Sequence, residues 1–214
     1  MDEIELNREE MINLLKELSK KYRKKAGKKM PAELVLVGGA SVVINYGFRN
    51  TTYDMDAMIF AASAMQDAIR EVADENNLMV GWLNDDFKRT TSYTPRLSRY
   101  AKHFRTFSNV VEIRCIEGEY LIAMKMKAAR EYKHDLSDII GILDAEYDRG
   151  NKITFEDIER AVTDLYDGWD GISEELIESI KKNITIRTDF ADLVDAIKVM
   201  ENMTKSVGRK PSDE

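Results

Sequence analysis

The chain has very few residues of the types that build disulfides and zinc sites. Its 214 residues include one cysteine, Cys115, and two histidines, His103 and His134. A single cysteine cannot form an internal disulfide or a cysteine-based zinc site. The two histidines lack the spacing that zinc ligands require. The composition therefore argues against a disulfide-stabilised fold and against zinc-dependent hydrolysis.

Long apolar runs are also missing. No stretch approaches the length of a membrane span, and residues 1–5 are acidic and lack the apolar centre of a signal peptide. We therefore expect a cytoplasmic protein with no membrane partner. The formal net charge of −7 argues against a protein that coats nucleic acid, although it permits a local basic patch. With 43% hydrophobic residues the chain has enough apolar side chains for a core.

Hydrophobic periodicity and capping residues predict the order of helices and strands. A core domain with an N-terminal helix is expected over residues 1–118, a helical subdomain over 119–206 and a disordered tail over 207–214. The predicted strands span residues 33–38, 53–60 and 110–116. The predicted helices of the core span residues 7–25, 39–47 and 64–76, the last opened by a capping box at Ser63. Beyond residue 119 the pattern is helical, with Thr154 and Ser173 as helix caps.

Two neighbouring motifs indicate a site for phosphate and metal. A buried strand ends in Gly38-Gly39 at the start of a helix, and such a turn lets backbone N–H groups approach a phosphate. The next strand carries Asp54 and Asp56, whose side chains share a face because strand side chains alternate. Their mutual repulsion favours a divalent cation between them. Arg49, in the loop before this strand, is either an exposed residue or a cation for the leaving phosphates.

Glu112 and Lys125 are charged residues in otherwise apolar patterns. Glu112 lies in the predicted strand 110–116. Taken alone, it is interpreted as an edge or surface residue. Taken together with Asp54 and Asp56, it is interpreted as a third metal-binding carboxylate. Lys125 lies within the apolar stripe of a helix, so it either snorkels to solvent or meets an anion in the site. Lys127 and Arg130 lie off that stripe.

Positive charge is concentrated in a basic stretch between Asp86 and Glu112. No carboxylate occurs between Asp86 and Glu112, and aromatic residues are interleaved with the cations. One interpretation is a solvated surface with ordinary salt bridges. The other is a cationic lip for triphosphate or RNA, with aromatic rings for base stacking. The cations of the stretch are Lys88, Arg89, Arg96, Arg99, Lys102 and Arg105.

In this order, the motifs resemble the polymerase-β type nucleotidyltransferase superfamily. The resemblance rests on the Gly-Gly turn, the Asp-x-Asp strand, Val111-Glu112-Ile113 and the helix of residues 121–130 followed by Asp135 and Asp138. It covers roughly residues 33–143. Within the superfamily the chain is most similar to bacterial minimal nucleotidyltransferases of the abortive-infection toxin (AbiEii-like) group.

The resemblance implies an α+β fold, with helices mainly on one face of a mixed sheet and a helical C-terminal part. It implies transfer of a nucleoside monophosphate from an NTP, with Mg²⁺ held by Asp54, Asp56 and Glu112. Gly38 and Gly39 would hold the triphosphate. Lys125 and Asp138 match the helical motif of the toxin-like members. In the family, aspartate is commoner at the position of Glu112 and serine at that of Gly39, with Ser41 nearby as a substitute hydroxyl.

The expected function is therefore Mg²⁺-dependent nucleotidyl transfer to RNA, protein or a small molecule, with a toxin–antitoxin role and an antitoxin partner. In-line displacement at phosphorus requires charge neutralisation and positioning, which these residue types supply. The alternative is a catalytically degenerate member that binds nucleotide or a partner protein. A Rossmann dinucleotide site is disfavoured, because Gly38-Gly39-Ala40-Ser41-Val42-Val43 lacks the Gly-x-Gly-x-x-Gly spacing.

Overall fold

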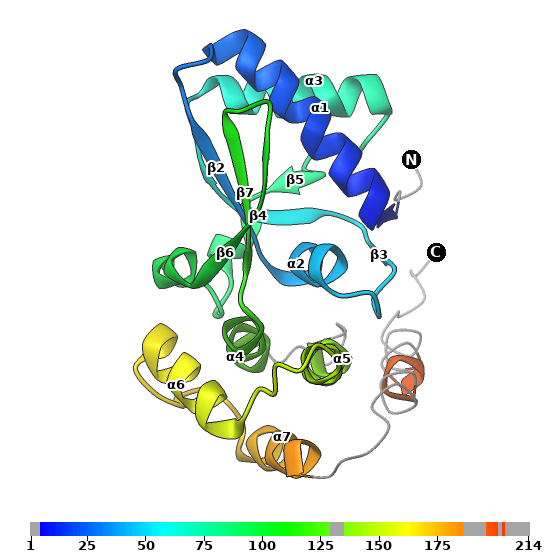
Figure 1. The fold of residues 1–214 in the computed structure, drawn as a ribbon. Helices are drawn as coiled ribbons and strands as arrows, with labels where there is room; N and C mark the ends of the chain where they lie inside the picture. The colour runs from blue at the N-terminus through cyan, green and yellow to red at the C-terminus, as the bar shows by residue number, and fades with distance from the viewer. Residues whose placement is uncertain (1–4, 129–134, 186–195, 201–202, 204–214) are drawn as a thin grey trace, which may run out of the picture. The chain divides into compact units, whose positions relative to one another are not determined.

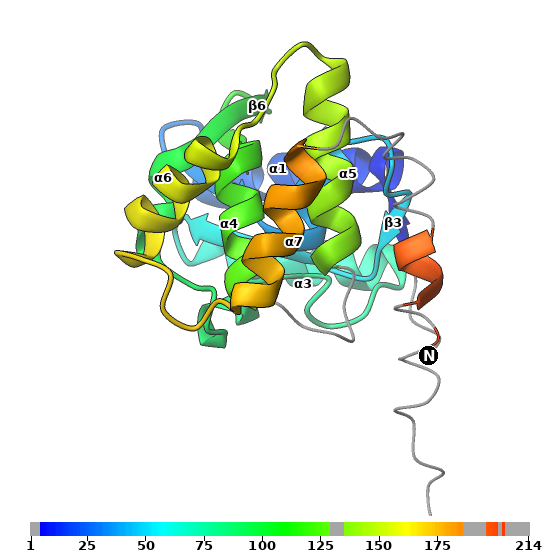
Figure 2. The ribbon, with the colours of Figure 1, turned by 90° about the horizontal axis from the view of Figure 1, so that it is seen from below.

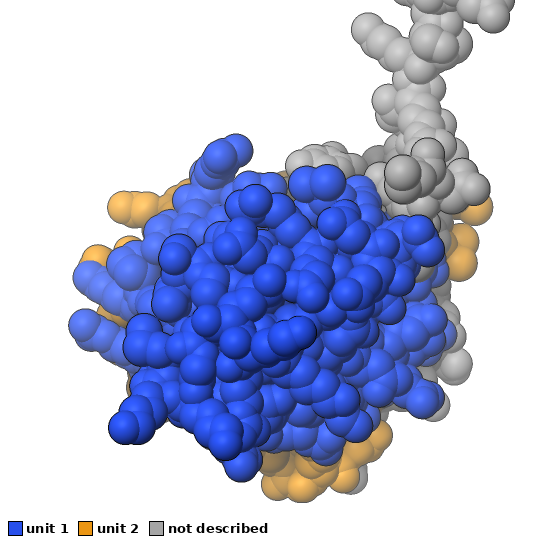
Figure 3. All heavy atoms as spheres, turned by 90° about the horizontal axis from the view of Figure 1, so that it is seen from above, with its two compact units in different colours: residues 1–117 blue, residues 118–214 orange. Residues whose placement is uncertain are grey.

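A computed structural model describes residues 5–128, 135–185, 196–200 and 203 (Figure 1). The chain forms two compact units, residues 1–117 and 118–214, which Figure 3 colours separately. The predicted domain division remains a prediction, and the tail 207–214 lies outside the described residues.

The first unit contains β1 (Leu6–Asn7), α1 (Arg8–Ala26), β2 (Ala32–Leu36), α2 (Gly38–Asn45), β3 (Thr51–Thr52), β4 (Met55–Phe60), α3 (Ala64–Asn76), β5 (Leu83–Asn84), the 3₁₀ helices η1 (Asp86–Arg89) and η2 (Pro95–Tyr100), β6 (Ala101–Phe107) and β7 (Val111–Ile116).

A five-stranded mixed sheet organises the first unit. Its strand order is β5-β4-β2-β7-β6. The central strand β2 runs antiparallel to β4 and parallel to β7, while β5 is parallel to β4 and β6 antiparallel to β7. A separate two-stranded ladder joins β1 to β3. The fold is thus the α+β arrangement with a mixed sheet that the sequence predicts.

Side chains that alternate along β2, β4 and β7 divide the sheet into two faces. One face carries Leu34, Leu36, Ala57, Ile113 and Cys115, which belong to the hydrophobic core that α1 and α3 complete (Figure 1). The opposite face carries the polar residues of interest, because Asp56 and Glu112 alternate with these core positions. The sheet thus buries one face under the two helices and leaves the acidic residues on the other.

Helix α1 forms because its apolar residues recur at helical spacing. Met11, Leu15, Leu18 and Tyr22 are all fully buried, which places one stripe of the helix against the sheet. The helix ends at Ala26 and is capped by Gly27, whose φ of +90° suits glycine. Helix α1 (Arg8–Ala26) and strand β7 (Val111–Ile116) confirm the predicted helix 7–25 and the predicted strand 110–116.

The second unit contains α4 (Gly118–Ala128), α5 (Asp135–Asp148), α6 (Phe155–Tyr166) and α7 (Glu174–Thr185). Helix α4 lies between α5 and α6 in both ribbon views (Figures 1 and 2). Thr154 caps α6 as predicted, accepting a hydrogen bond from the Asp157 N–H at 3.2 Å. Within the described residues no helix has the length and apolar character needed to cross a membrane.

Two local predictions need correction. Ser63 precedes α3 as expected, but its backbone is helical (φ −53°, ψ −29°) and its side chain accepts no capping hydrogen bond. The predicted capping box is therefore wrong, because a capping residue needs an extended backbone. Asp54 does not lie within the strand either, since β4 begins at Met55. The alternation of strand side chains therefore does not fix the direction of the Asp54 side chain.

Candidate active site

The turn between β2 and α2 presents backbone N–H groups beside a carboxylate. Gly38 adopts φ +53°, a conformation that favours glycine, and opens the eight-residue helix α2. The first N–H groups of a helix have no partner within it, and the helix dipole adds positive potential there. A Cβ added at Gly38 would lie 3.6 Å from Asp56 Oδ2, so the turn directly adjoins the acidic strand.

Gly39 is enclosed by a cation and a hydroxyl. A Cβ added there would lie 2.9 Å from Thr52 Oγ1 and 3.1 Å from Arg49 Nη2. Arg49 is held in place by its Nε, which donates to the Thr51 carbonyl at 3.1 Å. The structure therefore brings Arg49 to the glycine turn. It also explains why glycine occupies position 39, since a serine Cβ would collide with the Thr52 hydroxyl.

The two aspartates meet an asparagine from the neighbouring strand. Asp56 lies opposite Asn84 in the register of β4 and β5. Asn84 Nδ2 lies 3.4 Å from Asp54 Oδ2 and donates to the Gly81 carbonyl at 2.9 Å, while Asn84 Oδ1 accepts from the Asp86 N–H. Both carboxylates are half-buried. Oxygen donors of this kind suit Mg²⁺, which binds through one or two carboxylates together with substrate phosphates. Asp54 and Asp56 thus offer carboxylate oxygens of the kind that Mg²⁺ prefers.

Glu112 is not brought to this pair. In the sheet register Glu112 is level with Glu33, and Glu33 is level with Phe60. Phe60 lies four residues along β4 from Asp56, about 13 Å at the rise of a strand, and Glu112 lies two strands further across. Its carboxylate instead lies 3.0 Å from His103 Nδ1. Among the described residues no three carboxylate, imidazole or thiol groups gather closely enough to hold a metal.

Ser41 and Cys115 belong to the core of the first unit. Ser41 is fully buried, so its hydroxyl is enclosed rather than open to a ligand. Burial raises the pKa of the Cys115 thiol to about 12, with the Ser41 side chain beside it. The structure therefore does not open Ser41 to a phosphate as the sequence suggested.

Lys125 forms a buried ion cluster within the second unit. Its Nζ lies 3.1 Å from Asp135 Oδ1 and 2.7 Å from Asp138 Oδ2, and the three side chains are at most 6% exposed. The two aspartates lie three residues apart in the first turn of α5, on one face, where the helix dipole stabilises negative charge. Lys125 thus pairs with carboxylates of α5 and does not snorkel to solvent, while its contact with a phosphate or a catalytic carboxylate stays a prediction.

The basic stretch has partners at its borders. Lys88 pairs with Asp85 at 2.6 Å, and Lys102 pairs with Glu117 at 2.9 Å. The guanidinium of Arg105 lies over the rings of Phe104 and Phe107. Lys88 and Lys102 therefore form salt bridges with neighbouring carboxylates, while several cations of this stretch are exposed at the surface.

Sequence reasoning missed Thr52 and Asn84. Thr52 precedes the acidic strand, and Asn84 stands in a two-residue strand too short to be recognised from periodicity. The signal that was present is the run Asn84-Asp85-Asp86, whose asparagine ends a short apolar segment. Parallel pairing with β4 makes the asparagine a neighbour of the aspartates.

The chain is similar to a known family of nucleotidyltransferases. A family model described as "Nucleotidyltransferase of unknown function (DUF6036)" matches residues 12–156, more than half of the chain. The chain belongs to this nucleotidyltransferase family. The match spans the glycine turn, Arg49, both aspartates and Asn84. No curated protein and no solved structure matches the chain significantly.

Proposed function

We propose that the protein is a Mg²⁺-dependent nucleotidyltransferase whose reaction centre is the cluster of Gly38, Gly39, Arg49, Asp54 and Asp56. The observation that carries this proposal is the convergence of a helix N-terminus without a side-chain cap, a guanidinium and two carboxylates at one end of β2 and β4. The nucleotidyltransferase family supports the reaction class.

Each group has a distinct task in the proposed reaction. The backbone N–H groups of the glycine turn and the Arg49 guanidinium bind the β- and γ-phosphates of the NTP. Asp54 and Asp56 hold Mg²⁺, which when bound supplies positive charge to the phosphate oxygens. Asn84 orients Asp54 through its amide. The arrangement separates a cationic side for the leaving pyrophosphate from an acidic side for the α-phosphate.

The transfer itself is an in-line displacement. An oxygen of the acceptor hydroxyl forms a bond to the α-phosphorus, and the bond from that phosphorus to the bridging oxygen breaks, which releases pyrophosphate. The hydroxyl proton passes to a carboxylate of the aspartate pair or to water. Arg49 stabilises the charge that accumulates on the leaving group. Lys125 contact with a triphosphate remains a prediction from sequence, as does any contribution of Asp138.

Transfer of a radiolabelled nucleotide tests the proposal. The protein is incubated with each α-labelled NTP, Mg²⁺ and total cellular RNA or protein. We expect label on one acceptor class, lost in Asp56→Asn and on addition of EDTA. Arg70→Ala serves as a control because Arg70 is exposed on α3. Absence of transfer with every nucleotide, together with intact Mg²⁺–NTP binding, would favour the alternative of a degenerate nucleotide-binding module.

A narrower proposal concerns the biological role. The order of the sequence motifs supports membership of the AbiEii-like group and hence a toxin paired with an antitoxin protein in the cytoplasm of a bacterium. Controlled expression tests this role. Growth arrest by the wild type and normal growth with Asp56→Asn would support a toxin that acts through transfer. Normal growth with both would refute it.

A further inference from the structure

A pocket of about 360 Å³ opens on the first unit at the end of β4. Met58 and Phe60 of β4 form one wall, and Tyr93 with residues of η1 and η2 forms the rest. The volume is near the lower end of ligand pockets, about 300–1,000 Å³, which is room for one ring system and its substituents. The pocket is therefore sized for a single nucleotide or a comparable small group.

This pocket shares a strand face with the metal-binding aspartate. Asp56, Met58 and Phe60 occupy every second position of β4, so their side chains point to the same side of the strand. The distance from Asp56 along the strand is about 7 Å to Met58 and about 13 Å to Phe60. A substrate lying along this face would reach from the pocket to the carboxylates.

The register places the glycine turn and the pocket on opposite sides of Asp56. The Val37 N–H donates to the Asp56 carbonyl at 3.0 Å, so Gly38 and Gly39 follow at the start of β4, whereas the pocket lies at its end. In nucleotidyl transfer the attacking and leaving oxygens lie in line on opposite sides of the phosphorus. If pyrophosphate leaves toward the glycine turn, the acceptor hydroxyl enters from the side of the pocket.

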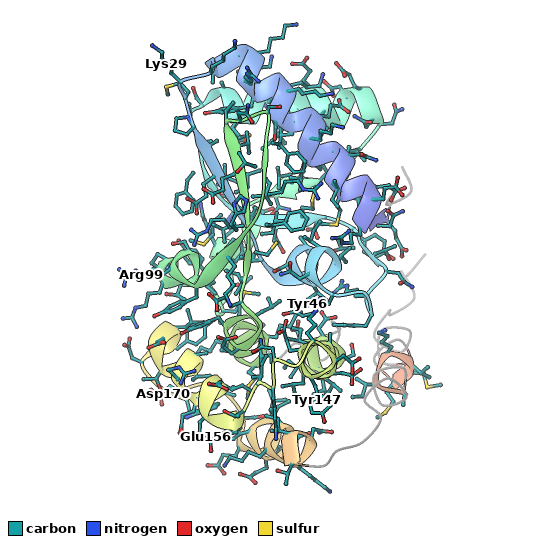
Figure 4. The ribbon with its side chains drawn as sticks, in the orientation of Figure 1. Lys29, Tyr46, Arg99, Tyr147, Glu156 and Asp170 are labelled. Atoms are coloured by element: carbon teal, nitrogen blue, oxygen red, sulfur yellow. The ribbon has the colours of Figure 1, made fainter. Side chains whose placement is uncertain are left out.

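The chemistry of the lining identifies the kind of acceptor. Phe60 is 48% exposed, which leaves much of its ring open. Tyr93 is fixed by an edge-to-face contact with Phe87, with 5.4 Å between ring centroids. Arg99 is exposed, and its side chain projects outward from η2 (Figure 4). Lys88 adds a second cation at the wall, partly neutralised by Asp85.

Aromatic rings beside exposed cations are the combination that binds single-stranded nucleic acid, since a base stacks on the ring and phosphates meet the cations. We infer that this pocket is the acceptor subsite and that it holds the terminal nucleotide of a single-stranded RNA end. The base stacks on Phe60, and Arg99 contacts the adjoining phosphate. The inference rests on the proposed function, because it uses the direction of in-line transfer at Asp56.

Binding of a short fluorescein-labelled single-stranded RNA tests the subsite, measured by anisotropy over a salt series without NTP. Phe60→Ala should weaken binding about tenfold or more through the loss of one stacked base. Arg99→Ala should weaken binding and reduce the salt slope by about 0.7, the value for one phosphate contact on a single strand. Met30→Ala, at a residue 47% exposed on the same unit, and Arg70→Ala are the matched controls and should bind as the wild type does.

The Mg²⁺–NTP-induced rise in melting temperature is measured on the same variants. An unchanged rise in Phe60→Ala and Arg99→Ala, with weakened RNA binding, supports the acceptor subsite. A smaller rise with unchanged RNA binding would make the pocket a site for the donor base and overturn the inference. Wild-type protein that binds Mg²⁺–NTP but no RNA also overturns it, while leaving the proposed function intact. Wild-type protein that does not bind Mg²⁺–NTP would instead refute the proposed function.

Discussion

Replacing Gly39 by alanine should impair the site far more than it impairs the fold. The added Cβ would lie 2.9 Å from Thr52 Oγ1 and 3.1 Å from Arg49 Nη2. Contacts below 3.0 Å force a shift. Thr52 is buried in β3 and has a stiff β-branched side chain, whereas the Arg49 guanidinium is the end of a longer chain. The contact with Thr52 would therefore push the turn itself aside, and the Arg49 guanidinium, which moves more easily, would be displaced with it.

The two consequences have different magnitudes. Overpacking of this kind costs about 1–3 kcal/mol of unfolding free energy, measured by urea denaturation. Displacement of a preorganised cation from the leaving phosphates should lower the transfer rate by about 10²-fold or more. Thr52→Ala removes the closest contact but not the one with Arg49. Combined with Gly39→Ala it should restore part of the stability and little of the activity.

Gly47→Ala provides the control, because no heavy atom lies within 4 Å of a Cβ added at Gly47. It should leave transfer close to the wild-type rate. A Gly39→Ala variant with wild-type stability and wild-type transfer would refute the close approach of Arg49 and Thr52 to the turn. A loss of activity that Thr52→Ala fully reverses would show that packing, rather than the displaced guanidinium, is responsible.

Two further predictions follow from buried groups. Lys125→Met should destabilise the protein by about 3–5 kcal/mol in urea denaturation, because it removes the buried ammonium group that pairs with Asp135 and Asp138; a neutral or stabilising effect would contradict the ion cluster. Because burial raises the pKa of Cys115 to about 12, the thiol stays protonated at pH 8 and should resist alkylation until the chain unfolds. Mass spectrometry after iodoacetamide treatment measures this, and rapid labelling of the native protein would contradict the burial.

The sequence was informative where apolar spacing and strand order decide the structure. The buried stripe of α1 and the alternation of Ile113 and Cys115 predicted a helix and a strand that the structure contains. Local signals were less reliable. The residue pattern at Ser63 matches a capping box, yet the backbone there is helical and cannot cap. Such a pattern specifies which atoms are available, while tertiary packing decides the backbone angles.

For the site too, some residues could be predicted from the sequence and others could not. The glycine turn and the aspartate pair were predictable because they are local motifs, and Arg49 stands only a few residues from them in sequence. Glu112 was misplaced because strand periodicity gives the face of a residue but not its level along the sheet. Only the register, which aligns Glu112 with Glu33 and Phe60, separates it from Asp56. Asn84 was missed because its strand has only two residues, and its pairing with β4 joins segments that are far apart in the sequence.

The most direct test of the account is the Mg²⁺-dependent binding of NTP at the aspartate pair. Melting temperatures are compared for wild type, Asp54→Asn and Asp56→Asn, with each nucleotide in the presence of Mg²⁺ or EDTA. At a ligand concentration 100 times Kd, the wild type should gain about 2.7 kcal/mol of stability. The variants should melt at or slightly above the wild-type temperature without ligand, because carboxylate repulsion is relieved, and should gain little with ligand. Equal stabilisation of all three proteins by Mg²⁺–NTP would contradict the assignment of Asp54 and Asp56 as the metal site.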